Sequence, residues 1–291
     1  MIEICEVGPR DGIQNEKTLL TLDEKVQLIE RLIAAGAKKI EVTSFVNEKV
    51  VPQMAQAEAL IELLPIYEDV TYCALVLSQS GKERLLQSPI THAQLAFAVS
   101  DAFNLKNARR TTEQSIIEMS EIVKELKAAN KSVNVILATA YGCPYAGHII
   151  LHDVISITKQ FIELGVDEIT FADTVGLATP NTIEQSIRLF KEQFGDFPLG
   201  LHLHNTRGLG IANALVGIQN GITHFDASVG GIGGCPFAPK AVGNICTEDF
   251  VYMLHQMGYE TTIQLDRYVE VAQWIEEKLQ RKIDGMLMKT Y

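Results

Sequence analysis

The chain repeats one pattern of apolar and polar positions along its length. A short run rich in valine, isoleucine and leucine is followed by a turn, then by a stretch with apolar residues at helical spacing that often ends in glycine, and then by the next apolar run. Residues 32–42, 164–170 and 219–226 each show the junction of helix, glycine, short turn and strand. Repeated junctions of this kind are typical of βα units.

Eight such units are predicted, with no linker or low-complexity segment between them. The apolar runs have few alternating polar residues, which is typical of parallel strands covered on both faces. The segment EVGPRDG at 6–12 lacks the GxGxxG turn of a dinucleotide-binding sheet. The pattern therefore predicts an α/β fold, a (β/α)8 TIM barrel with additional C-terminal helices, as a single domain over residues 1–291. The expected strands are 2–7, 39–45, 70–77, 93–99, 133–140, 168–173, 199–205 and 224–229, and the expected helices are 22–36, 53–64, 111–130, 151–165, 181–194, 209–221, 247–258 and 265–280.

Composition and charge argue against nucleic acids and membranes as partners. The net charge of −11 argues against nucleic acid, because phosphate binding requires a basic surface. No apolar run reaches the roughly 20 residues of a membrane span, and the first residues do not resemble a signal peptide. The five cysteines contain no CxxC pair, which is typical of reduced thiols. We therefore expect a cytoplasmic protein that binds neither nucleic acid nor a membrane.

In such a barrel the chemistry lies at the C-terminal ends of the strands. Polar residues follow or end several predicted strands, whereas the opposite strand ends show no comparable cluster in the sequence. The sharpest feature is His202-Leu203-His204, because residues two apart on a strand project to the same face. With Asp11 and Asn244 they predict a site for Mg²⁺ or Mn²⁺, with Zn²⁺ or Co²⁺ as substitutes. The alternative is a pair of histidines with purely structural hydrogen bonds.

Three further charged side chains are candidates near this site. Arg10 follows a Gly-Pro turn and could stabilise an enolate oxygen, or could form only a loop salt bridge. Glu41 and Asp173 sit in apolar strands, where a carboxylate must be paired or have a raised pKa. A buried arginine–glutamate brace is the structural alternative for Glu41.

Two loops are candidates for substrate contact. Residues 228–237 contain four glycines and Cys235, and could form a closing loop whose thiol donates a proton, or a flexible surface turn. Lys106 follows the fourth strand and could anchor the phosphates of a substrate, or could lie on a solvated helix start.

Several long motifs resemble those of the 3-hydroxy-3-methylglutaryl-CoA lyase family. They are EVGPRDGIQNE at 6–16, EVTSFV at 41–46, VPQM at 51–54, GCPY at 142–145, HLH at 202–204, GIGGCPFA at 231–238, GN at 243–244 and TED at 247–249. The match covers nearly the whole chain. The resemblance implies metal-dependent retro-Claisen cleavage of a 3-hydroxy-3-methylglutaryl thioester to acetyl-CoA and acetoacetate, by an enzyme that we expect to be a homodimer.

The resemblance also implies roles for individual residues. The metal ligands would be Asp11, His202, His204 and Asn244, and the expected catalytic residues are Arg10, Asp11, Glu41, His202 and Cys235. Gln14, Asp173, Lys106 and Arg10 would contact the substrate.

Three departures from the family pattern bear on specificity. Asn205 replaces the usual aspartate after HxH and is expected to point away from the metal. Gly230 replaces alanine or valine, and residues 136–141 lack the expected polar and aromatic side chains. Three alternatives stay open: a lyase for another branched 3-hydroxyacyl-CoA, a synthase that condenses acetyl-CoA with a 2-oxo acid, and a metal-binding scaffold without activity.

Overall fold

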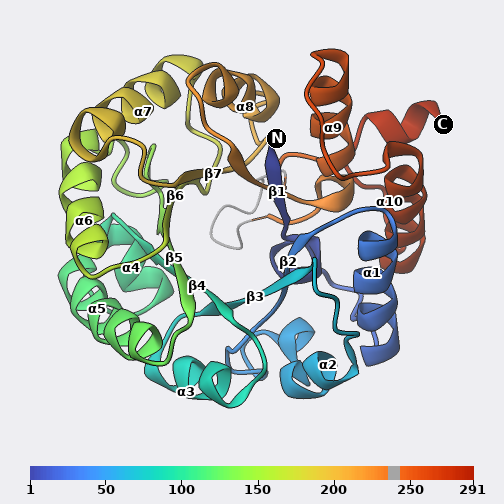
Figure 1. Cartoon of the computed structure of the whole chain (residues 1–291), viewed down its shortest axis with the longest axis horizontal. Coiled ribbons are helices and arrows are strands. Elements are labelled where there is room, and N and C mark those ends of the chain that lie inside the picture. Colours follow the sequence, from blue (N-terminus) through green and yellow to red (C-terminus); the bar gives the residue numbers. More distant parts are fainter. Residues whose placement is uncertain (235–242) are drawn as a thin grey trace.

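The computed structural model describes residues 1–234 and 243–291. Eight parallel strands form a closed barrel in sequence order, with β1 paired to both β2 and β8. The predicted (β/α)8 barrel is therefore confirmed, and Figure 1 shows the helices as a ring around the strands. The strands are β1 (Glu3–Glu6), β2 (Lys39–Ser44), β3 (Thr71–Val76), β4 (His92–Ala98), β5 (Ser132–Ala138), β6 (Glu168–Asp173), β7 (Leu199–Leu203) and β8 (His224–Ala227).

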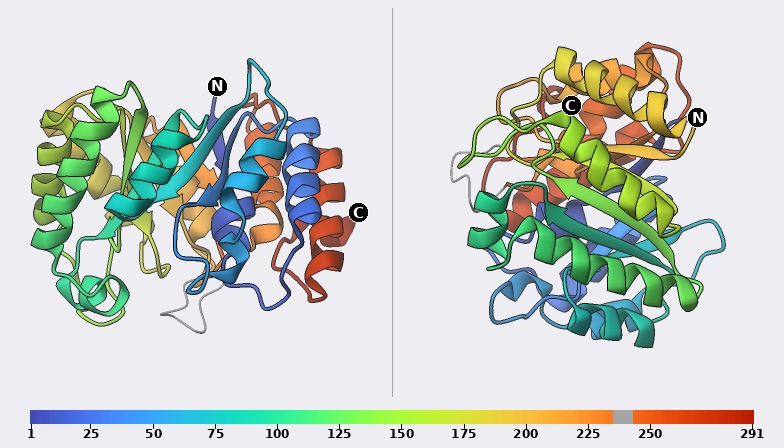
Figure 2. Two further views of the ribbon diagram at one scale, coloured as in Figure 1. Left: turned by 90° about the horizontal axis from the view of Figure 1, so that it is seen from below. Right: turned by 90° about the vertical axis from the view of Figure 1, so that its left-hand side faces the viewer.

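Helices follow the strands and cover them from outside, as the side views in Figure 2 show. Buried apolar side chains such as Leu28 of α1 and Phe161 of α6 fill the space between helices and strands. Among the described residues, no helix combines the length and apolar character needed to cross a bilayer. The helices are α1 (Leu22–Ala34), α2 (Ala57–Leu63), α3 (Gln79–Gln87), α4 (Asp101–Asn107), α5 (Thr112–Ala128), α6 (Leu151–Glu163), α7 (Pro180–Phe194), α8 (Gly210–Gln219), α9 (Thr247–Gln256) and α10 (Leu265–Leu279), with short turns η1 (Gly8–Gly12), η2 (Pro52–Met54), η3 (Val229–Gly231) and η4 (Leu287–Thr290).

Sequence periodicity missed two helices and joined two others. The prediction had no helix at α3, where Ser78 caps the N-terminus by accepting the Gly81 N–H, or at α4. The single helix predicted over 53–64 is wrong, because the chain breaks between η2 and α2 at Gln56, whose φ is 62°. The buried Gln53 amide instead donates to the Thr18 carbonyl at 2.7 Å, which ties this turn to the loop before α1.

The N-terminal strand ends carry a cluster of ion pairs that the sequence did not predict. Lys39 at the start of β2 donates to Glu3 of β1 at 2.8 Å and to Glu168 of β6 at 3.1 Å. His224 at the start of β8 lies 3.9 Å from Glu3. These residues are far apart in sequence, and only closure of the barrel brings their strand ends together.

Candidate active site

Three buried ligating side chains converge at the mouth of the barrel, where the strands end. Asp11 lies in η1 directly after β1, His202 is in β7 and His204 follows it. One ligand atom from each lies within 4.8 Å of the others. The two imidazoles project to the same side because they are two positions apart on extended backbone, and their Nε2 atoms are 3.1 Å apart. This group has the donor atoms and the spacing to hold a metal ion.

Asn244 lies beside these three residues. An isolated bridge pairs its backbone with that of His204, and its side-chain Nδ2 donates to Asp11 at 2.7 Å and to the Ile232 carbonyl at 3.2 Å. Both donations fix the orientation of the amide. Its Oδ1 is buried and has no hydrogen-bond partner among the described residues. A buried carbonyl oxygen without a donor is unfavourable unless a cation occupies that position.

Asp226 supports His202 and is not among the residues predicted from the sequence. Its Oδ2 lies 3.0 Å from Nδ1 of His202, and both side chains are buried. Burial by itself disfavours the charged imidazole, but the hydrogen bond and charge of Asp226 outweigh it, so the pKa of His202 is raised. A proton held on Nδ1 leaves the Nε2 lone pair available to a metal. The available signal was position: Asp226 is inside β8, the neighbour of β7.

Arg10 connects the cluster to a second buried carboxylate. Its Nε donates to Glu41 at 2.5 Å and its Nη1 to Asp11 at 2.7 Å. Burial raises the pKa of Asp11, but the charges of Arg10, His202 and His204 and the Asn244 hydrogen bond together outweigh it and bring the value down to about 2. Burial raises the pKa of Glu41 above its ordinary value despite the arginine. Glu41 thus forms the arginine brace that the sequence left as an alternative, and its Oε1 has no partner among the described residues.

The three predicted substrate contacts other than Arg10 differ in their surroundings. Gln14 donates to Asp11 at 2.9 Å, so it orients a metal-site carboxylate. Asp173 accepts the backbone N–H groups of Leu177 at 2.7 Å and Ala178 at 3.0 Å, so both its oxygens hold the β6–α7 loop. Lys106, at the end of α4, places Nζ 3.6 Å from the ring centroid of Tyr145.

The glycine-rich segment after β8 is ordered in its described part. Val229, Gly230 and Gly231 form the buried turn η3, and Gly230 donates its N–H to Glu248 at 3.0 Å. Gly230 has a φ of 65°, and a Cβ there would lie 2.2 Å from Cδ1 of Ile283. Glycine is therefore needed here because the backbone is left-handed and Ile283 packs closely against it. The loop does not need it for flexibility. Cys235 lies outside the described residues, so its role stays a prediction.

Asn205 points away from the cluster, as predicted. Its Oδ1 accepts the N–H of Gly210 at 3.1 Å, at the start of α8. The Asn205 amide oxygen thus accepts a hydrogen bond at the start of α8, which an amide can do as well as the aspartate usual in the family.

A cavity of about 460 Å³ opens at this end of the barrel and includes the cluster in its wall. This volume is in the range of small-molecule sites. Its lining comprises Arg10, Asp11, Gln14, Asn15, Ser44, Val46, Val50, Val51, Leu75, Leu77, Ala96, Phe97, Ala98, Phe103, Asn107, Ile136, Ala138, Ala172, Thr174, His202, His204 and Gly234. Glu41, Asp173 and Lys106 are not among them.

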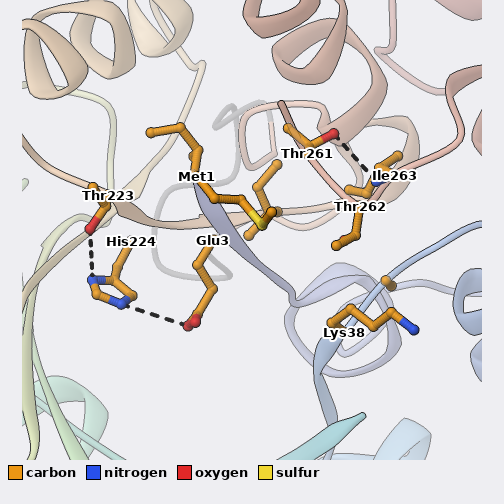
Figure 3. Close-up of a pocket in the computed structure, with 11 residues that line it drawn as sticks. Met1, Glu3, Lys38, Thr223, His224, Thr261, Thr262 and Ile263 are labelled. Carbon is orange, nitrogen blue, oxygen red and sulfur yellow. Dashed lines mark hydrogen bonds and ion pairs between the residues drawn. The ribbon is translucent and has the colours of Figure 1, made fainter. Parts of the chain in front are cut away.

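A second cavity of about 250 Å³ lies at the N-terminal end of the strands (Figure 3). Glu3, His224 and Thr223 form a short chain of contacts on one of its sides, and Thr261 hydrogen-bonds to the Ile263 N–H on another. These polar groups are satisfied by one another. The ligating cluster and the larger cavity are both at the other end of the barrel.

Comparison with known proteins identifies relatives along the full chain. A hydroxymethylglutaryl-CoA lyase of Bacillus subtilis is 36% identical over 290 residues, covering 100% of this chain and 97% of that protein. An (R)-citramalyl-CoA lyase of Chloroflexus aurantiacus is 38% identical over 298 residues, covering 99% of this chain and 94% of that protein.

Solved structures agree with these sequence relatives. The crystal structure of the Bacillus subtilis HMG-CoA lyase matches with a TM-score of 0.96 at 36% identity, covering 99% of this chain and 97% of that one. An HMG-CoA lyase of Acinetobacter baumannii in complex with coenzyme A and 3-methylmalate matches with a TM-score of 0.95 at 36% identity, covering 99% and 94%. The sequence profile of one family, HMGL-like, matches residues 1–275. The chain therefore belongs to the HMGL-like family.

Proposed function

We propose that this chain is a divalent-metal-dependent carbon–carbon lyase that cleaves 3-hydroxy-3-methylglutaryl-CoA to acetyl-CoA and acetoacetate. The observation that carries the proposal is the contact of Arg10 with Asp11, which puts a permanent cation beside a set of metal-ligating groups in the wall of one cavity. The names of the Bacillus subtilis relatives support the choice of acyl group.

The residues at the mouth suit Mg²⁺ or Mn²⁺. Asp11, His202, His204 and Asn244 would hold the ion, with the unpartnered Oδ1 of Asn244 as the amide ligand. Two imidazoles, a carboxylate and an amide oxygen match the preferences of these metals and leave positions for substrate oxygens. When bound, the ion would polarise the substrate hydroxyl and carbonyl oxygens and stabilise negative charge on them.

The reaction requires three events that the chain's residues support. The hydroxyl on C3 loses its proton to a basic group of the cavity wall, for which the Asp11 carboxylate, with a second oxygen beside its metal-ligating one, is the described candidate. The C2–C3 bond then breaks, C3 becomes the ketone of acetoacetate, and the bonding pair forms the enolate of acetyl-CoA. The guanidinium of Arg10 stabilises the enolate oxygen. The thiol of Cys235 protonates C2, and the proton that the base took from the hydroxyl restores the thiol, so that one proton passes in total from the hydroxyl to C2.

Glu41 orients the arginine for this task. Its carboxylate takes the Nε hydrogen bond, so the Nη side of the guanidinium remains toward Asp11 and the cavity. Because the pair is buried, the arginine loses little side-chain entropy when substrate binds.

One further candidate is a lyase for another branched 3-hydroxyacyl-CoA. The relative named for (R)-citramalyl-CoA is as similar to this chain as the hydroxymethylglutaryl-CoA lyases are. Residues 136–141, which lack the polar and aromatic side chains of the family pattern, also supply two residues of the cavity wall.

A direct assay tests the proposal. Purified protein is stripped with a chelator, reloaded with Mn²⁺ or Mg²⁺, and given 3-hydroxy-3-methylglutaryl-CoA, with acetyl-CoA and acetoacetate measured separately. Equal amounts of both products, absent without metal and absent in His204→Ala, are expected. Cleavage of citramalyl-CoA alone would overturn the acyl group, and thioester synthesis from acetyl-CoA and a 2-oxo acid would overturn the lyase class.

A further inference from the structure

The cavity wall is divided between two halves of the barrel. Asp11 after β1, Ser44 at the end of β2 and His202 in β7 bring polar groups to one half. The wall from β3 to β6 is apolar. Its strand residues are Leu75 of β3, Ala96, Phe97 and Ala98 of β4, Ile136 and Ala138 of β5, and Ala172 of β6. The ring of Phe97 packs against Phe161 of α6.

The apolar half is open because its side chains are small. Four of its seven strand residues are alanine, and two of them, Ala98 and Ala138, are register partners on neighbouring strands. Ala96 is likewise the partner of Ile136. Ala96 and Ala138 are partly exposed although they lie within barrel strands, so their methyl groups face the cavity. Space beside them is available for a ligand.

This open space adjoins the metal ligands. Ala172 of β6 is the register partner of His202 of β7. A substrate carbon whose hydroxyl lies at the His202 side can therefore direct one of its substituents along Ala172 toward β5 and β4.

The described groups on the β3–β6 side offer little to a charged substituent. Thr174 already accepts the Thr139 N–H at 2.8 Å, and Asn107 is at the exposed end of α4. The guanidinium of Arg110 pairs with Glu118 and caps the Leu77 carbonyl. A carboxylate held here would lose hydration without a described cation to replace it, whereas a hydrocarbon would gain from burial.

From this arrangement we propose that the β3–β6 half of the cavity is a hydrocarbon subsite, and that besides the methyl compound the enzyme cleaves 3-hydroxyacyl-CoA thioesters whose C3 branch is longer than methyl. This inference rests on the proposed lyase function and extends its substrate class to longer C3 branches. Ala96, Ala138 and Ala172 determine the size of branch that fits.

Two thioesters that differ only in the branch test the subsite: 3-hydroxy-3-methylglutaryl-CoA and 3-hydroxy-3-butylglutaryl-CoA. Cleavage of the second yields acetyl-CoA and 3-oxoheptanoate, with the hydroxyl proton lost from oxygen and one proton gained at C2. For the Mn²⁺-loaded protein, kcat/KM is expected to be about tenfold higher for the butyl compound, because its three additional methylenes are buried. A ratio of one or below overturns the inference.

Substitutions in the apolar wall test whether the preference for the butyl compound arises there. Ala138→Leu and Ala96→Leu should each bring the butyl-to-methyl ratio of kcat/KM below one by filling the subsite. Ala128→Leu, the same change at the exposed end of α5, should leave the ratio at its wild-type value. A wild-type ratio in both cavity variants would overturn the inference even if either one were unstable in thermal melts.

Binding separates this inference from the proposed function. If neither thioester is cleaved, the lyase proposal fails, and calorimetric dissociation constants of the two compounds still decide the subsite. Tighter binding of the butyl compound, lost in Ala138→Leu, supports the hydrocarbon subsite. Equal or weaker binding of the butyl compound overturns it.

Discussion

Asp226 Oδ2 lies 3.0 Å from Nδ1 of His202, across the junction of β8 and β7. The two residues are 24 positions apart, and the contact exists because the strands that carry them are neighbours in the barrel. It makes an aspartate outside the family-like motifs a positioning residue for a candidate metal ligand.

Replacing Asp226 should therefore weaken metal binding. In Asp226→Asn the carboxylate that accepts the Nδ1 proton is replaced by an amide, whose NH₂ group can donate to Nδ1 instead. His202 then no longer favours the tautomer with its proton on Nδ1 and a lone pair on Nε2. We expect Mn²⁺ affinity to fall about 10–100-fold, as is typical when such supporting groups are removed. Calorimetric titration measures it, with Asp153→Asn on the exposed first turn of α6 as control. Unchanged affinity in Asp226→Asn would contradict this role.

Arg10→Gln should reduce turnover without weakening metal binding. The substitution removes the cation assigned to the enolate oxygen, and loss of such a group typically lowers kcat by about 10²–10³. Metal affinity should stay the same or rise, since a positive charge 2.7 Å from Asp11 opposes a cation at that site. Steady-state kinetics and Mn²⁺ titration measure the two effects.

Two controls accompany this variant. Arg84→Gln removes a surface arginine that pairs with Glu58 and should change neither quantity. Arg10→Gln alone leaves the buried Glu41 carboxylate without its cation and should lower stability. The double variant Arg10→Gln/Glu41→Gln removes that carboxylate as well, so stability should recover while turnover stays low. Recovery of turnover in the double variant would refute the role of Arg10 in the reaction.

Cys235→Ala should lower kcat steeply and leave metal affinity nearly intact. The reason is that the thiol is assigned to proton transfer and is not among the predicted ligands. Rapid mixing in deuterated water should show slower incorporation of the label into acetyl-CoA. A loss of Mn²⁺ binding comparable to the loss of turnover would show instead that the residue supports the metal site.

Glu248 should make stability depend on pH. Its side chain is fully buried and accepts the Gly230 N–H, and burial raises its pKa to about 7. A folded-state pKa above the unfolded value means that the protonated form favours folding. The contribution is therefore complete below about pH 4.5 and is lost as the pH rises through about 7.

Glu248→Gln removes this titration while keeping a hydrogen-bond acceptor. Relative to the wild type, the variant should gain about 2 kcal/mol of unfolding free energy between pH 5 and pH 8. Urea denaturation at both pH values measures the difference, with Glu121→Gln on exposed α5 surface as control. Parallel pH profiles for wild type and Glu248→Gln would show that the carboxyl does not titrate in this range.

Gly230→Ala should destabilise the turn after β8 for two separable reasons. Left-handed backbone costs a residue with a Cβ about 1–2 kcal/mol, and the new methyl would meet Ile283. Gly165→Ala, also at positive φ but with open space around its Cβ position, isolates the backbone cost. Ile283→Val should restore part of the stability of Gly230→Ala in urea denaturation. No recovery in the double variant would show that the Ile283 contact relaxes without cost.

Local pattern predicted most of the barrel but not its interruptions. The strands were found because each is an apolar run between turns, and α1 and α5 because apolar residues recur at helical spacing in both. The helix α3 was not predicted because it is short and mostly polar, so its apolar residues show little helical spacing. The break at Gln56 escaped because the tertiary contact of Gln53 outweighs the local helical preference.

The candidate site divides in the same way. His202 and His204 were predictable because strand geometry alone puts both imidazoles on one face, and Asp11 because it follows a strand that must end at the same mouth. Which partners complete them could not be read from spacing, since β7, β8 and η1 meet only when the barrel closes. Asp226 behind His202 and the Arg10–Glu41 contact are consequences of that closure.

The sequence by itself determined the fold class, the family and the chemical types at the barrel mouth, because those depend on periodicity and on residues adjacent in the chain. The tertiary structure decided how the groups are used. Asp173 accepts hydrogen bonds from the backbone of the β6–α7 loop, and Gly230 after β8 is required by close packing. The tertiary structure also gathered alanines from three strands into one apolar wall. Each of these depends on distances between segments that sequence spacing does not measure.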